Sequence, residues 1–92
     1  MTVISRSISL STEGHGDILD ITRQVQGEIQ NSGLQNGTAT VFSPSATSAL
    51  TTLEYESGCI QDLKRLVEEI IPADRPYAHN QRWGDGNGHS HL

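Results

Sequence analysis

The sequence has little of what marks secreted scaffolds or nucleic-acid binders, namely cysteine and basic charge. Cys59 is the only cysteine, so no internal disulfide can form and nothing points to a cross-linked secreted protein. Six Lys and Arg residues stand against eleven Asp and Glu, which gives a net charge of −5. The only adjacent basic pair is Lys64-Arg65. Because contacts to phosphate backbones need clustered basic side chains, we expect no nucleic-acid partner.

Long apolar runs are also missing. No apolar stretch approaches the roughly 20 residues that a membrane-spanning helix needs. The first residues lack the basic region and apolar stretch of a signal peptide. At 92 residues, of which 34% are hydrophobic and 18% charged, the chain has the composition of one small globular domain. We therefore expect a cytoplasmic protein with no membrane partner.

Two segments have the pattern of β-strands. In residues 3–11, Ile4, Ile8 and Leu10 share a parity with Arg6, while serines take the alternate positions, which is the period of a strand with one buried face. Residues 38–42 are β-branched and aromatic, and they follow the turn signal Asn36-Gly37. Glycines between residues 13 and 17 indicate a further turn.

Two helices are also expected. The first runs from an N-cap at Thr22 to a left-handed residue at Gly33, with Val25 and Ile29 four apart on one face. The second ends before Pro72. Its apolar residues, at spacings of three and four, are Ile60, Leu63, Val67 and Ile70. Together these elements predict a single α+β domain over residues 1–92, in which two helices pack on a mainly antiparallel, sandwich-like β-sheet.

Three histidines near the C-terminus form the main candidate site. If residues 88–92 are extended, His89 and His91 lie on the same face of a strand and can present two nitrogens to one metal ion. His79 could supply a third nitrogen across the Gly-rich loop, leaving an open coordination position. The alternative is that the two C-terminal histidines simply form an exposed end.

A second candidate site is the hydroxyl-rich stretch over residues 43–52. Its O–H and N–H groups could bind phosphate, but it has no P-loop signature, and a polar strand edge explains the composition as well. Glu54 and Glu56 would share one face of a strand. They could act as acid and base, or they could be a solvated edge.

Three ordered blocks of sequence resemble the YjbQ family, the secondary thiamine-phosphate synthase family. They are Gly-His-Gly-Asp-Ile-Leu-Asp-Ile-Thr at 14–22, the stretch from Thr-Val-Phe-Ser-Pro to Thr-Leu-Glu at 40–54, and Arg-Trp-Gly-Asp-Gly-Asn-Gly-His-Ser-His at 82–91. The resemblance implies a β-rich α+β subunit that assembles as a homotrimer, with a metal or anion site near the histidines. It covers the N-terminal two-thirds of the family pattern, because family members continue for several dozen residues beyond the third block. We therefore expect the chain to be truncated at its C-terminus.

The resemblance also implies an activity, in which an aminopyrimidine diphosphate is joined to a thiazole phosphate with release of diphosphate. On this hypothesis a divalent metal, zinc or alternatively magnesium, is bound by His79, His89 and His91. The expected phosphate-binding residues are Ser45, Thr47 and Asn87, and the expected catalytic acid or base is Glu54. The alternative is a non-enzymatic trimer that binds a metal or a small-molecule phosphate ligand.

Overall fold

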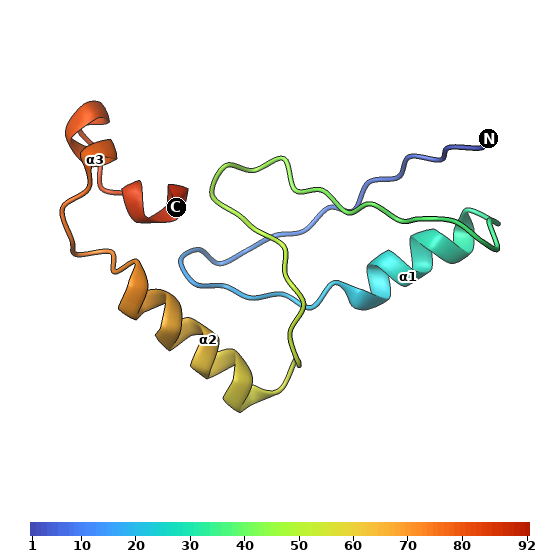
Figure 1. Ribbon diagram of the computed structural model, residues 1–92, viewed down its shortest axis with the longest axis horizontal. Coiled ribbons are helices and arrows are strands. Elements are labelled where there is room, and N and C mark those ends of the chain that lie inside the picture. The colour runs from blue at the N-terminus through green and yellow to red at the C-terminus, as the bar shows by residue number, and fades with distance from the viewer. The chain divides into compact units, whose positions relative to one another are not determined.

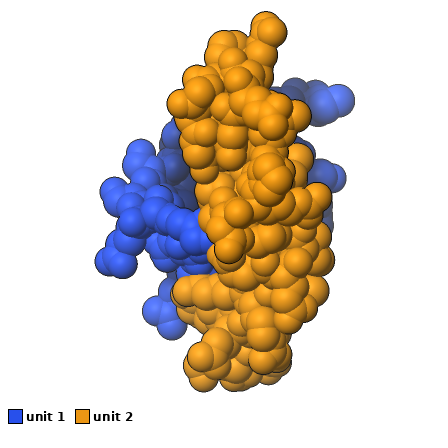
Figure 2. Space-filling view, turned by 90° about the vertical axis from the view of Figure 1, so that its left-hand side faces the viewer, with its two compact units in different colours: residues 1–41 blue, residues 42–92 orange.

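The computed structural model describes all residues from 1 to 92, in two units that comprise residues 1–41 and 42–92 (Figures 1 and 2). The first unit contains α1 (Thr22–Asn31). The second unit contains α2 (Ser57–Ile70), α3 (Ala78–Trp83) and the 3-10 helix η1 (Gly88–His91). None of these helices is both long enough and apolar enough to cross a membrane.

The expected β-sheet is absent, so the prediction of an α+β, sandwich-like fold was wrong. Helices account for 37% of the chain and no residue lies in a strand. Residues 3–11 and 38–42 have the sequence pattern of strands but make no ladder hydrogen bonds. A helix satisfies its own backbone groups, whereas a strand needs a neighbour for every ladder bond. Alternation therefore marks a segment that is able to pair, and the pairing itself depends on a second segment.

Helix α1 is where the sequence placed it, but its start differs by one residue. Thr22 is the first helical residue, and the N-cap is Ile21, whose side chain makes no capping bond. The carboxylate of Asp20 instead accepts a hydrogen bond from the Thr22 N–H at 2.9 Å. Hydrogen bonds from Thr22 lower the pKa of Asp20. The expected left-handed residue after the helix is confirmed, since Gly33 has a φ of 73°.

Helix α2 is also confirmed, and it begins before the first apolar residue of its pattern. The N-cap is Glu56, whose carboxylate accepts hydrogen bonds from the N–H groups of Gly58 and Cys59. These two backbone bonds lower the pKa of Glu56. The helix ends at Ile70, two residues before Pro72, as the sequence predicted.

Burial of apolar side chains is slight. Tyr77, at 9% exposure, is the one large apolar residue that is buried. Others remain open to solvent, including Phe42 at 79% and Trp83 at 66%. Local hydrogen bonds and caps, rather than a shared core, therefore hold the elements described here, and the best-packed part of the chain surrounds Tyr77.

Candidate functional site

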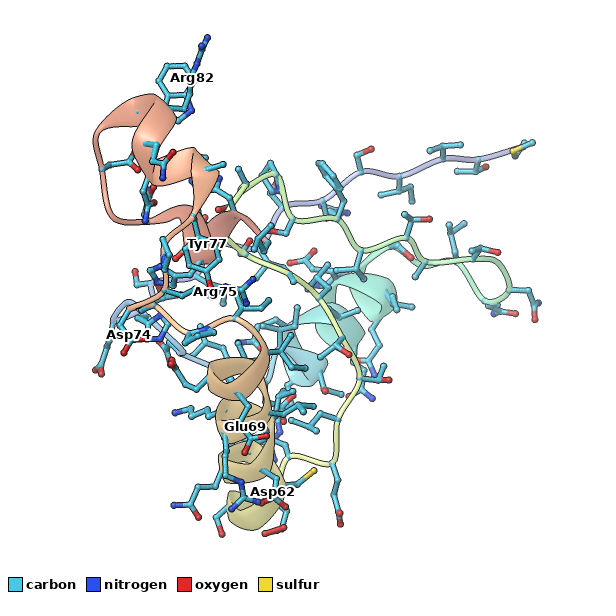
Figure 3. The ribbon with its side chains drawn as sticks, turned by 60° about the vertical axis from the view of Figure 1, so that its left-hand side comes forward. Asp62, Glu69, Asp74, Arg75, Tyr77 and Arg82 are labelled. Atoms are coloured by element: carbon cyan, nitrogen blue, oxygen red, sulfur yellow. The ribbon has the colours of Figure 1, made fainter.

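The candidate site is the segment of residues 77–92, which we call the α3–η1 segment. It is anchored at its start by Tyr77, whose hydroxyl donates a hydrogen bond to the carbonyl of Pro72 at 2.7 Å. The guanidinium of Arg75 lies 5.5 Å from the centre of the same ring, and Figure 3 shows the two side chains together. The Tyr77 side chain, directly before α3, is thus held both by its hydroxyl and by its ring.

The segment turns back on itself after α3. Gly84 adopts the left-handed conformation, with a φ of 68°, and its N–H donates to the carbonyl of Asn80 at 2.8 Å. Four residues later the buried Gly88 begins η1. The Gly88 N–H donates to the side-chain oxygen Oδ1 of Asn80 at 2.7 Å. One asparagine therefore bonds to both sides of the turn and brings η1 against α3.

Two of the three predicted metal ligands are brought together by this turn. The rings of His79 in α3 and His91 in η1 are stacked, with centroids 4.4 Å apart and an angle of 22° between their planes. Asp85 lies beside His79, with its Oδ1 3.4 Å from Nδ1 of that ring. That contact does not meet hydrogen-bond geometry, so it is an electrostatic contact that becomes an ion pair when the imidazole is protonated.

The third histidine is placed differently from the expectation. Residues 88–91 form a 3-10 helix and are not extended, so the premise of a strand carrying His89 and His91 was wrong. With three residues per turn, side chains two positions apart point to different sides. No group of three or more His, Cys, Asp or Glu side chains is gathered as a ready metal site. The three-histidine site therefore remains a prediction.

The predicted phosphate-binding residues lie in two places. Asn87 precedes η1, and its amide nitrogen, when turned toward Asp85, donates to the two carboxylate oxygens at 3.1 and 3.3 Å. Ser45 and Thr47 lie in an exposed turn, in which the Thr47 N–H donates to the Ser45 hydroxyl at 3.3 Å. Such a turn is a local arrangement typical of serine and threonine. Only Asn87 belongs to the α3–η1 segment.

The two glutamates have separate environments. Glu54 is exposed, and its backbone carbonyl accepts a hydrogen bond from the Glu56 N–H at 2.9 Å. The Glu56 side chain caps α2. The idea that both share one face of a strand was wrong, because no strand forms there.

Sequence reasoning missed the residues that build the segment, namely Tyr77, Asn80 and Gly88. Their contacts join positions five and eight apart, as in the bonds from Tyr77 to Pro72 and from Gly88 to Asn80. Both contacts join residues in different local elements across a turn, so the periodicity within one helix or strand does not predict them. The one available signal was the tyrosine itself, since a buried tyrosine hydroxyl needs a hydrogen-bond partner.

Residues 6–92 match the family model described as UPF0047 protein YjbQ-like. The chain belongs to the YjbQ family. The resemblance carried by its three sequence blocks is thus confirmed.

Three curated proteins of the YjbQ family are similar to the chain. A UPF0047 protein of Methanothermobacter thermautotrophicus is 37% identical over 92 residues, which are 100% of this chain and 63% of that protein. A UPF0047 protein of Archaeoglobus fulgidus is 31% identical over 92% of this chain and 64% of its own length. The UPF0047 protein YugU of Bacillus subtilis is 25% identical over 95% of this chain and 64% of its own length. The chain therefore spans less than two-thirds of these relatives. No solved structure matches it.

Proposed function

We propose that the α3–η1 segment is the functional site of this YjbQ-family chain, and that it binds a divalent metal ion together with a phosphate-bearing small molecule. One observation carries the proposal. His79 and His91, from the two ends of the segment, lie with ring centroids 4.4 Å apart, and Asp85 lies beside His79. Imidazole and carboxylate are among the donor types that bind zinc.

The chemistry of the donor set fits zinc. His79, His89 and His91 would hold the ion. The carboxylate of Asp85, 3.4 Å from Nδ1 of His79, would orient that ring so that its other nitrogen faces the metal. The stacked rings must part for both to reach one ion, so binding is expected to rearrange the side chains of η1.

The phosphate-bearing ligand would bind beside the metal. Asn87 belongs to the same segment as the histidines, and its amide would have to leave the Asp85 carboxylate in order to donate to the ligand. Ser45 and Thr47 would add hydroxyl and N–H donors, and Glu54 would serve as acid or base. In this form the full-length protein, as a homotrimer, would join an aminopyrimidine diphosphate to a thiazole phosphate, with zinc or magnesium neutralising the diphosphate that leaves.

A non-enzymatic binding protein is the second candidate. It is favoured by the position of Glu56, whose carboxylate is engaged at the start of α2 and does not pair with Glu54. General acid–base chemistry would then depend on Glu54 alone. A metal- or phosphate-binding role needs no such pair.

The first test is the zinc content of the full-length protein by elemental analysis. We expect near-stoichiometric zinc in the wild type and its loss in the double variant His79→Ala, His91→Ala. The matched control is His15→Ala, which removes a histidine outside the segment and should retain the metal. A wild type without zinc, before and after incubation with zinc salt, would overturn the metal proposal.

A steady-state assay with both thiamine precursors then separates the two candidates. Many turnovers per subunit, lost in Glu54→Gln, would establish the synthase. Zinc binding without turnover would leave the binding protein as the function.

A further inference from the structure

The contact between α3 and η1 depends on one side chain. Asn80 lies in α3, and its Oδ1 accepts the N–H of Gly88 at 2.7 Å in a partly buried position. Gly88 is the first residue of η1, which is a helix of four residues. A 3-10 helix of this length has little stability of its own, so its position depends on such a contact.

The packing at Gly88 shows how closely the two elements approach. A Cβ added to Gly88 would lie 2.7 Å from Oδ1 of Asn80, 2.9 Å from Cβ of Tyr77 and 3.2 Å from Cβ of His79. The first two distances are shorter than real Cβ contacts allow. The backbone of η1 therefore rests directly on the start of α3, on the same turn that carries His79.

From this geometry we propose that Asn80 is a positioning residue, which acts through Gly88 to place His91 against His79. The proposal rests on the proposed metal-binding function and assigns that site a residue that would not itself touch the metal. The side-chain oxygen Oδ1 of Asn80 fixes the start of η1, and His91 is the last residue of that helix. The ring contact at 4.4 Å follows from this docking.

Loss of the Asn80 acceptor should release η1 from α3. His79 would stay on its helix, while His89 and His91 would move with the released η1. The metal ligands would then have to be ordered at the moment of binding, which weakens the complex. Removal of groups that orient metal ligands typically lowers metal affinity by about 10- to 100-fold, and we expect a loss in this range.

Three variants of the full-length protein test the proposal. Asn80→Leu keeps the size of the side chain and removes the acceptor. Asn80→Asp keeps an acceptor oxygen at the same place, so η1 should remain docked on α3. Gln81→Leu is the matched control, because it removes an exposed amide from the next position of the same helix.

Two readouts are needed. In metal-free protein, nuclear Overhauser contacts between the ring protons of His79 and His91 report docking directly. In parallel, titration with zinc gives the affinity. We expect the ring contacts in the wild type, Asn80→Asp and Gln81→Leu, and their loss in Asn80→Leu with weaker zinc binding. Unchanged amide signals from α2 would show that Asn80→Leu has not simply unfolded the second unit.

The outcomes separate this inference from the function on which it rests. If the wild type binds no zinc, the metal proposal fails, while the ring contacts still decide whether Asn80 positions His91. If Asn80→Leu keeps both the ring contacts and the zinc affinity of the wild type, Asn80 has no positioning role. If Asn80→Asp loses the contacts as fully as Asn80→Leu does, the hydrogen bond is not the cause and the proposal is overturned.

Discussion

Replacement of Gly88 by alanine should loosen the α3–η1 segment. The added methyl group would meet Oδ1 of Asn80 at 2.7 Å and Cβ of Tyr77 at 2.9 Å. A Cβ atom is attached to the backbone and cannot swing away, and Tyr77 is also held by its bond to Pro72. The clash can therefore be relieved only if η1 moves off α3, which breaks the bond between Gly88 and Asn80.

The magnitude follows from two opposing effects. Overpacking by one methyl group costs about 1–3 kcal/mol. Alanine also lowers the conformational entropy of the unfolded chain, which offsets about 0.4–1 kcal/mol of this destabilisation. The net destabilisation of the segment is then about 1–2 kcal/mol, which corresponds to opening about 5- to 30-fold more often.

Amide hydrogen exchange measures this opening locally. The reporters are the N–H of Gly84, bonded to the Asn80 carbonyl at 2.8 Å, and the N–H of Ser90, bonded to the Asn87 carbonyl at 2.9 Å. Both should exchange about 5- to 30-fold faster in Gly88→Ala. Gly86→Ala is the matched control, because a Cβ there has no atom within 4 Å. Equal exchange rates in the two variants would refute the packing argument at Gly88.

Two further predictions concern the second unit. The hydrogen bonds that lower the pKa of Glu56 from 4.5 stabilise α2 above that pH, and this contribution is lost as pH falls through the lowered value. Far-UV circular dichroism should therefore show an acid loss of helicity that is smaller in Glu56→Gln; parallel curves would contradict the capping role. Tyr77→Phe removes the 2.7 Å bond to Pro72 and should destabilise the start of α3 by about 0.5–1.5 kcal/mol. The measurement is amide exchange at Asn80, whose N–H donates to the Tyr77 carbonyl at 3.1 Å, and an unchanged rate would show that the hydroxyl contributes nothing.

Local features of the chain were readable from its sequence. The apolar spacings of α1 and α2, Gly33 after α1 and Pro72 after α2 each act within a few residues, and the structure confirms them. The caps were less readable. Asp20 and Glu56, rather than Thr22, supply the side-chain oxygens at the two helix starts, because several nearby residues can fill such a position and only backbone geometry selects one.

The candidate site was readable only in part. The sequence singled out His79, His89 and His91, and the structure brings the first and last of these within 4.4 Å. The sequence did not reveal that residues 88–91 form a 3-10 helix, since an H-x-H pair is equally compatible with a strand. The contact that holds this helix against α3 is the bond from Gly88 to Asn80, eight residues away, which no local pattern predicts.

By itself, then, the sequence determined the family, the two longer helices and the identity of the histidines. The tertiary structure decided that residues 3–11 and 38–42 do not pair into a sheet, and that the ring of His91 stacks on the ring of His79. The physical reason is the range of the interactions. A helix satisfies its hydrogen bonds between residues four apart, so its pattern is sufficient evidence. A strand or a docked 3-10 turn depends on a partner elsewhere in the chain, which no local pattern specifies.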